Sequence, residues 1–136
     1  SPAMWREYFQ PLYRQYVEIA HDTGKKVFMH SDGQIIDIIP ELIKLGIDAL
    51  NSQVFCMGLE RLGNRFKGQI TFWGEIDRQH LLPHASAEEI RNAVHQFTRC
   101  FWDGGGVIGQ LEFGPGAKPS NIYSAFEAWE SCDCTC

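Results

Sequence analysis

The 136-residue chain carries 12 basic and 17 acidic residues, which gives a net charge of −5. Its composition, 44% hydrophobic and 21% charged, is typical of one globular domain, and it contains no basic run of the kind that nucleic-acid binding needs. No apolar stretch approaches the ~20 residues of a membrane span, and the first residues, SPAMWREYFQ, lack a signal-peptide pattern. We therefore expect a cytoplasmic protein that binds neither nucleic acid nor membranes.

Helical and strand patterns alternate along the chain. An N-terminal helix is expected from Trp5 to Gly24, with a kink at Pro11 because proline cannot donate a backbone hydrogen bond. Four short β-favouring runs follow, at residues 27–30, 49–53, 70–77 and 107–112. Helical periodicity or capping signals follow each run, over 34–46, 57–66, 87–103 and 119–131, and Ser86 with Glu89 forms an S-x-x-E capping box.

This order predicts an α/β fold, a helix followed by four β-α units with parallel strands. Strands that alternate with helices pair in parallel through right-handed crossovers. Four units are too few for a closed eight-stranded barrel, which needs about 200 residues or more. The chain is therefore expected to be either a small open sheet or half of a barrel.

The five cysteines are unevenly distributed. Cys56 and Cys100 are expected to be small buried side chains, since no paired base is visible near them in the sequence. The other three form a CxCxC tail, and a terminal segment seldom has the fixed surroundings that metal ligands need. We therefore divide the chain into one domain, residues 1–131, and a disordered Cys-rich tail, residues 132–136.

Polar side chains collect where the predicted strands end. Ligands of parallel α/β folds bind beyond the carboxyl ends of the strands, so these side chains should share one neighbourhood. They are His30, Asp32, Asn51, Gln53, Trp73, Glu75, Asp77, Gln110 and Glu112. A spacing of two residues would place both members of three pairs on one face of an extended strand: His30 with Asp32, Glu75 with Asp77, and Gln110 with Glu112.

Structural roles account equally well for some of these residues. A turn or a helix cap would explain Asp32, which precedes Gly33, and Asp77. Trp73 is more often a core residue than a substrate platform. Glu112 is harder to explain structurally, because an unpaired carboxylate inside the apolar run VIGQLEF would be costly to bury. It needs a cation, a hydrogen-bond partner or water.

Three segments resemble the C-terminal half of the uroporphyrinogen decarboxylase family, which also includes cobalamin-linked methyltransferases. They are HSDGQIIDIIPELIKLGIDALNSQV, ITFWGEIDRQHLLPHASAEEIRNAV and GGGVIGQLEFGPGAKPSNIYSAFEAW, and together they cover nearly the whole chain except the tail. The family fold is a (β/α)8 TIM barrel. The resemblance implies that this chain carries the last four strands, and that its partner is a missing N-terminal half-barrel or a second copy.

The resemblance also implies one of two chemistries. In the methyltransferase branch, a cysteine after the His-Ser pair and a later cysteine bind zinc together with the histidine; this chain has Asp32 and the loop 114–117 at those places. In the decarboxylase branch, a histidine ends the last strand where this chain has Phe113. The porphyrinogen-binding aspartate and arginines of that branch would lie in the other half.

Together these observations give a set of expected roles. We expect His30, Asp32 and Glu112 to bind a divalent metal such as zinc. Protons would be handled by the catalytic residues Glu75, Asp77 and Glu112. Substrate contacts are expected from Asn51, Gln53, Trp73 and Gln110.

The favoured function is methyl transfer linked to a corrinoid, performed by the full-length parent, with this half alone inactive. Decarboxylation of a porphyrinogen-like, tetrapyrrole carboxylic acid without any cofactor is the first alternative. The second is a catalytically silent half-barrel that serves as a folding or interaction module.

Overall fold

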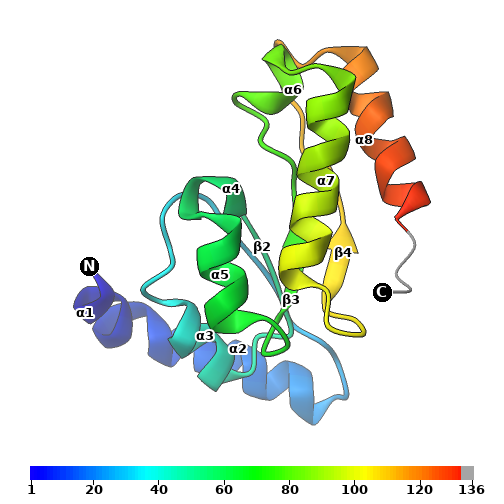
Figure 1. Cartoon of the computed structure of the whole chain (residues 1–136). Coiled ribbons are helices and arrows are strands. Elements are labelled where there is room, and N and C mark those ends of the chain that lie inside the picture. The colour runs from blue at the N-terminus through cyan, green and yellow to red at the C-terminus, as the bar shows by residue number, and fades with distance from the viewer. Residues whose placement is uncertain (133–136) are drawn as a thin grey trace.

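The computed structural model describes residues 1–132 and is built on a four-stranded parallel sheet with the strand order β1-β2-β3-β4 (Figure 1). The strands are β1 (Phe28–Ser31), β2 (Ala49–Ser52), β3 (Thr71–Gly74) and β4 (Val107–Gly109). Every neighbouring pair is parallel, so the predicted α/β fold is confirmed and is consistent with half of a TIM barrel. The prediction of a disordered tail concerns residues that, from 133 onward, lie outside the described part.

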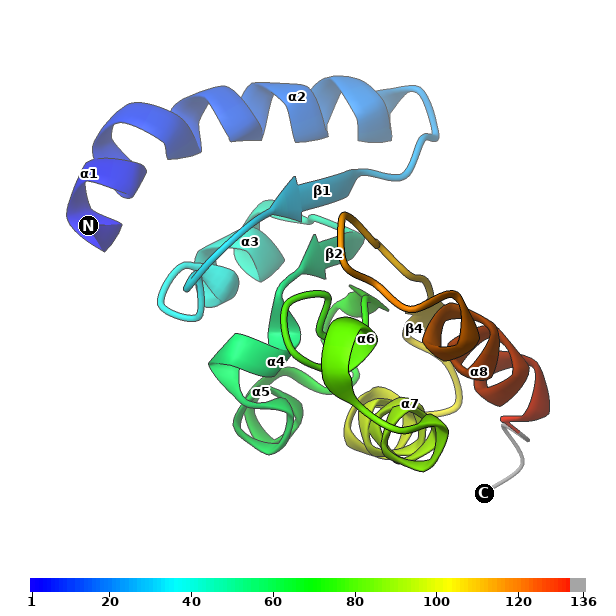
Figure 2. The same cartoon turned by 90° about the horizontal axis from the view of Figure 1, so that it is seen from above.

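Helices connect the strands and cover one face of the sheet. Figure 1 shows α5 and α7 in front of the strands, and Figure 2, seen from above, shows the strands along an arc with α3, α5, α7 and α8 on its outer side. The helices are α1 (Pro2–Met4), α2 (Gln10–Asp22), α3 (Ile39–Leu45), α4 (Val54–Met57), α5 (Leu59–Phe66), α6 (Leu81–His84), α7 (Ala87–Phe101) and α8 (Pro119–Ser131).

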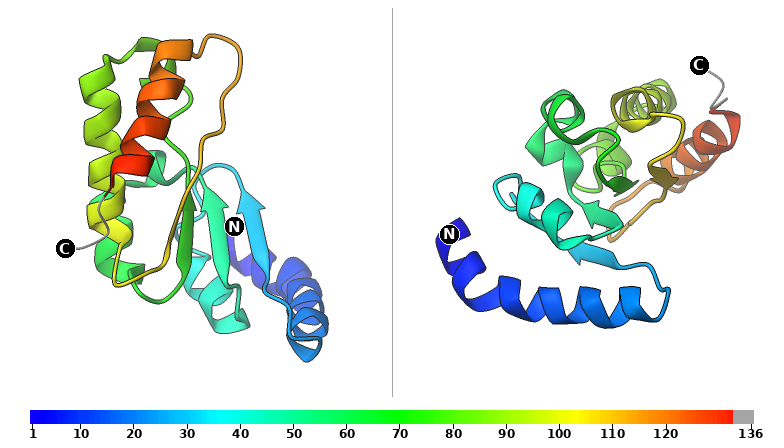
Figure 3. Two further views of the ribbon diagram at one scale, coloured as in Figure 1. Left: turned by 90° about the vertical axis from the view of Figure 1, so that its right-hand side faces the viewer. Right: turned by 90° about the horizontal axis from the view of Figure 1, so that it is seen from below.

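The irregularity expected at Pro11 takes the form of a π-helical segment immediately before it. This segment, Trp5–Phe9, joins α1 to α2, and the N–H of Gln10 donates to the carbonyl of Trp5. Pro11 then lies in the first turn of α2, where a missing N–H costs no hydrogen bond. Figure 3 shows α2 beyond β1, at the end of the molecule opposite α8.

Helix α3 begins later than its apolar pattern suggested. The helix was expected from residue 34, but it begins at Ile39, because Pro40 occupies its first turn and favours a helix start there. It ends as expected at Gly46, which adopts a left-handed conformation with φ of 92°. The capping box of Ser86 and Glu89 at the start of α7 is confirmed in both of its hydrogen bonds.

The core lies between the sheet and these helices. Phe72 of β3 stacks on Phe101 with ring centroids 4.1 Å apart, and Phe101 in turn meets the Phe97 ring edge-on at 4.8 Å. All three rings are fully buried. The prediction that Cys56 is a buried hydrophobic side chain is wrong, because it lies exposed on the short helix α4, whereas Cys100 is half-buried against the core.

Asp48 holds together the elements at the amino-terminal end of the sheet. Its carboxylate accepts hydrogen bonds from the N–H of Val27 at 2.8 Å and from Nζ of Lys26 at 2.8 Å, and it lies 2.9 Å from Nε2 of His21. Burial raises the pKa of this carboxyl, but these partners outweigh burial and lower the pKa to about 2. Asp48 therefore ties the end of α2 and the entry to β1 to the start of β2.

Gly74, the last residue of β3, permits the close approach of α7. A Cβ added at this glycine would overlap the ring of Phe97, which is fully buried. β3 ends at this glycine, and Glu75 is the next residue, so the predicted strand 70–77 was too long.

We predict that Gly74→Ala destabilises the fold by about 1–3 kcal/mol, because the added methyl group forces the Phe97 ring out of its packed position. Chemical denaturation monitored by circular dichroism measures this loss. Gly114→Ala is the matched control, since no atom lies within 4 Å of its added Cβ. Equal stability of the two variants would contradict the prediction.

Candidate functional site

Four charged side chains meet beyond the carboxyl ends of the strands, and we call them the mouth cluster: Asp32, Glu75, Arg78 and Glu112. Arg78 is its centre. Its Nη2 lies 2.9 Å from Oδ1 of Asp32, and its Nη1 contacts Oε1 of Glu112. Asp32 follows β1, Arg78 follows β3 and Glu112 follows β4. One guanidinium therefore joins the segments that follow three different strands.

Glu75 is the buried member of the mouth cluster. Only 3% of the residue is exposed, and its Oε2 has no hydrogen-bond partner among the described residues. Burial raises the pKa of Glu75; the Arg78 guanidinium opposes this, while Glu112 and Asp32 add to it, and the net pKa is about 7. The pKa of this carboxyl therefore lies close to neutral pH, well above that of an ordinary glutamate.

A hydrogen-bonded row crosses the inner face of the sheet below this cluster. The register places His30 beside Asn51 and Asn51 beside Trp73. Asn51 Oδ1 is hydrogen-bonded to Nδ1 of His30, and its Nδ2 donates to the carbonyl of Trp73 at 2.7 Å and to Oε1 of Gln110 at 3.1 Å. Asn51 thus connects all four strand ends and, being buried, positions its neighbours.

Two other residues of the predicted site have structural partners. Asp77 accepts hydrogen bonds from the N–H groups of Gln79 and His80 and from Nδ1 of His80, so it caps the turn into α6. Burial raises the pKa of Asp77, but these hydrogen bonds lower it overall. Gln53 accepts a hydrogen bond from the N–H of Gly33 at 3.0 Å and so holds the loop after β1.

Trp73 lies at the surface of the inner face of the sheet. It is half-buried and meets the ring of Phe28 edge-on, with centroids 5.5 Å apart and an interplanar angle of 67°. Phe28 is 53% exposed. The two rings therefore form an apolar surface beside the polar row.

A small chamber opens between the segments that follow β2 and β3. It has a volume of about 120 Å³, and Glu75 forms part of its wall. The lining residues are Gln53, Phe55, Cys56, Glu75, Asp77, Arg78, Gln79 and His80. A buried carboxyl at the wall of a cavity is a common arrangement for acid–base chemistry.

Comparison with protein families agrees with this geometry. A family model described as uroporphyrinogen decarboxylase (URO-D) matches residues 1–131, nearly the whole chain. The chain belongs to the uroporphyrinogen decarboxylase family. A search of curated proteins found no match. Within residues 1–132, no helix combines the length and the apolar character needed to cross a bilayer.

His30, Asp32 and Glu112, which were expected to bind a metal, do not form a metal site in this structure. Nε2 of His30 lies 3.8 Å from Oδ1 of Asp32, but Arg78 stands between Asp32 and Glu112. Over the described residues, no three His, Cys, Asp or Glu side chains converge around one point. A divalent cation placed between the carboxylates would meet the guanidinium charge, so we derive no catalytic step through a metal.

Sequence reasoning missed Arg78, the residue on which the geometry depends. The one indication in the sequence was its position: Arg78 is a basic residue that directly follows the G-E-I-D segment. The carboxylates expected at the strand ends would need such a cation nearby. Cys56 was also missed as a wall of the chamber, because exposure of a cysteine cannot be read from its neighbours. The pairing expected of Glu75 and Asp77 on one strand face is not observed, since both residues lie beyond the end of β3.

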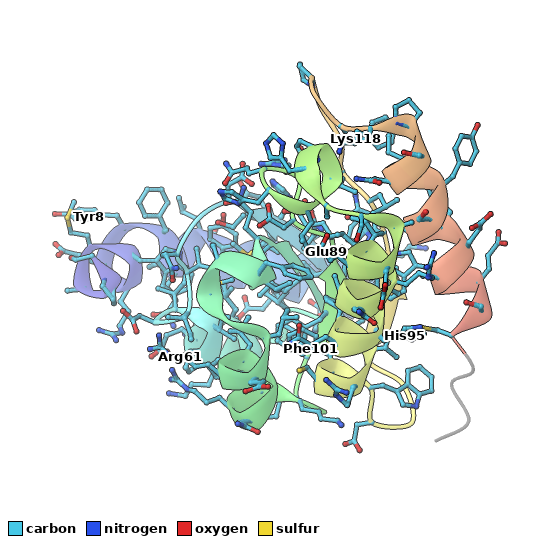
Figure 4. All side chains as sticks on the ribbon, turned by 45° about the horizontal axis from the view of Figure 1, so that its top comes forward. Tyr8, Arg61, Glu89, His95, Phe101 and Lys118 are labelled. Atoms are coloured by element: carbon cyan, nitrogen blue, oxygen red, sulfur yellow. The ribbon has the colours of Figure 1, made fainter. Side chains whose placement is uncertain are left out.

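We predict that Arg78→Gln raises the pKa of Glu75 further, because the guanidinium is the group that lowers it. Carbon-13 NMR titration of labelled glutamate carboxyls measures this change. Arg61→Gln, at an exposed residue of α5 (Figure 4) that is not among the groups acting on Glu75, should leave the titration unchanged. An unchanged pKa in Arg78→Gln would contradict the role assigned to Arg78.

A second prediction concerns stability and pH. Because folding raises the pKa of Glu75 from 4.5 to about 7, its contribution to stability is fully present below pH 4.5 and is lost as the pH rises through 7. The charged groups facing it are Arg78, Glu112 and Asp32. Between mildly acidic and mildly basic pH, the wild type should lose up to about 3 kcal/mol relative to Glu75→Gln, which cannot titrate.

Thermal denaturation across this pH range measures the difference between the two proteins. Glu127→Gln, an exposed residue of α8, is the control and should follow the wild type. Parallel stability curves for the wild type and Glu75→Gln would show that Glu75 titrates at an ordinary pKa.

Proposed function

We propose that this chain supplies the general acid, Glu75, of a methyl-transfer site in a uroporphyrinogen decarboxylase-family enzyme. The observation that carries the proposal is the buried carboxyl of Glu75, with a pKa of about 7, beside a guanidinium that is paired with two other carboxylates. A group whose pKa lies near the working pH is best able to transfer a proton during a reaction.

In the proposed reaction, Glu75 in its acid form donates its proton to the ether oxygen of an O-methyl donor. The bond between that oxygen and the methyl carbon breaks, its electron pair stays on the oxygen, and the donor leaves as a neutral alcohol. A reduced corrinoid, when bound, supplies the nucleophile that accepts the methyl group. Arg78 then stabilises the carboxylate left on Glu75, which regains a proton from water.

The charge of the mouth cluster supports this reaction over its main alternative. Decarboxylation of a tetrapyrrole acid is the second candidate, since Glu75 could equally protonate a carbanion and Arg78 could bind a carboxylate. However, Arg78 is already paired with Asp32 and Glu112. The net negative charge here would repel a substrate with several carboxylates, whereas it would not repel a neutral ether.

We also propose that a second half-barrel completes the site, supplied either by another segment of the same protein or by a second copy. β1 and β4 are the outer strands of the described sheet, so each has one edge without a strand beside it. The inner face carries the half-exposed Phe28 ring, and such edges and faces favour pairing with further strands. The carboxyl ends of those strands would wall the mouth opposite Glu75.

We predict that Glu75→Gln lowers kcat for methyl transfer by about 10²- to 10⁴-fold, the usual contribution of a general acid, with a smaller change in KM. The assay uses the complete enzyme, methyl β-D-glucopyranoside or dimethyl ether as the donor and free reduced cobalamin as the acceptor, and the reaction is followed by cobalamin absorbance. Glu127→Gln is the control. An unchanged kcat in Glu75→Gln would refute the role of Glu75 as the acid.

A further inference from the structure

The chamber beside Glu75 is large enough for a small substituent of a ligand. Its volume of about 120 Å³ is well above the roughly 10–15 Å³ of such space that a single water needs. Phe55 supplies an apolar side, and the other lining residues carry polar groups. This combination suits a ligand part with a carbon skeleton and several hydrogen-bonding atoms.

The charges of the chamber wall disfavour an anion. Arg78 and His80 are the basic side chains among the lining residues, and both are already paired: Arg78 with Asp32 and Glu112, and His80 with Asp77. No unpaired cation among these residues is available to neutralise a carboxylate or phosphate. The acidic lining residues Glu75 and Asp77, together with the two carboxylates paired with Arg78, would also repel an anionic ligand.

The hydrogen-bonding groups favour hydroxyls. Oε2 of Glu75 is buried and without a partner in the described part of the chain, which is a costly state unless a ligand supplies the missing hydrogen bond. Among the other lining residues, Arg78 can only donate, whereas the side-chain amides of Gln53 and Gln79 can donate and accept. A hydroxyl group both donates and accepts, so adjacent hydroxyls can satisfy such a mixed set. An ammonium group can only donate and would leave the O–H of a protonated Glu75 without an acceptor.

We propose that this chamber binds an uncharged polyhydroxylated group, such as the vicinal hydroxyls of a sugar or polyol, with Glu75 and Arg78 as its polar contacts from the mouth cluster and with Asp32 and Glu112 acting on it through their charge. The inference rests on the proposed function and deepens it: the O-methyl donor is then a neutral hydroxylated molecule. It assigns to Asp32, Glu112 and Arg78 the task of selecting against charged substrates.

Three probes that differ in one substituent test the proposal by isothermal titration calorimetry at neutral pH. They are methyl β-D-glucopyranoside, its uronate counterpart methyl β-D-glucuronide, and its 2-amino-2-deoxy counterpart. The neutral glycoside should bind at least about tenfold more tightly than either charged analogue, a difference of about 1.4 kcal/mol. Tighter binding of the uronide or of the amine would overturn the proposal, as would a lack of binding by all three in the millimolar range.

A variant identifies the source of the selectivity. Glu112→Gln removes one negative charge while keeping the size of the side chain, so the uronide should then bind within about threefold of the neutral glycoside. Glu127→Gln on α8 should keep the wild-type preference. An unchanged preference in Glu112→Gln would refute the role of the mouth cluster in selection.

The outcomes separate this inference from the proposed function. If the neutral glycoside binds selectively but Glu75→Gln retains full methyl-transfer activity, the binding proposal stands and the proposed reaction fails. If Glu75 proves essential but the uronide binds most tightly, the reaction stands and the ligand class assigned here is wrong.

Discussion

Three carboxylates can occupy one small volume only if a cation or a shared proton offsets their repulsion, and the mouth of this protein uses both. Arg78 pairs with Asp32 and Glu112, and Glu75 retains its proton to an unusually high pH. Because these residues follow three different strands, the ion pairs also fix the positions of three loops relative to one another. The reactivity of Glu75 and the shape of the mouth therefore have a single electrostatic origin.

The backbone beneath this cluster explains why the carboxyl of Glu75 is buried. Gly74 allows the end of β3 to lie against the buried Phe97 ring, and Glu75, the next residue, is only 3% exposed. Asn51 adds a second constraint, since its amide bonds to the carbonyl of Trp73 and to the side chain of Gln110. A buried amide with all its hydrogen bonds made holds its neighbours in one arrangement.

The sequence predicted the order of elements well, because apolar periodicity, the capping box at Ser86 and the glycine at residue 46 are local signals. It also predicted that polar residues gather at the strand ends, since parallel strands place those ends at one edge. It could not predict which of these polar residues form ion pairs or hydrogen bonds with one another. The pair of Arg78 and Asp32 joins residues 46 positions apart, and nothing near either residue indicates the other.

The roles within the site were harder to predict for the same reason. Glu75 and Asp77 look equivalent in the sequence, yet within the described residues Oε2 of Glu75 is buried without a partner, whereas Asp77 caps the turn into α6. Arg78 and Glu112 act on Glu75, whereas the N–H groups of Gln79 and His80 donate to Asp77. These different surroundings arise in the folded chain and cannot be read from the two residues alone.

The contacts of Asp48 allow residues at the other end of the sheet to change without loss of the fold. Asp48 fastens α2, β1 and β2 at the amino-terminal end of the strands, whereas the mouth cluster lies beyond their carboxyl ends. Mutations that are distant and share no partners usually have independent effects on stability. Natural selection or a directed-evolution library could therefore exchange residues of the mouth for new substrates while the opposite end of the sheet preserves the scaffold.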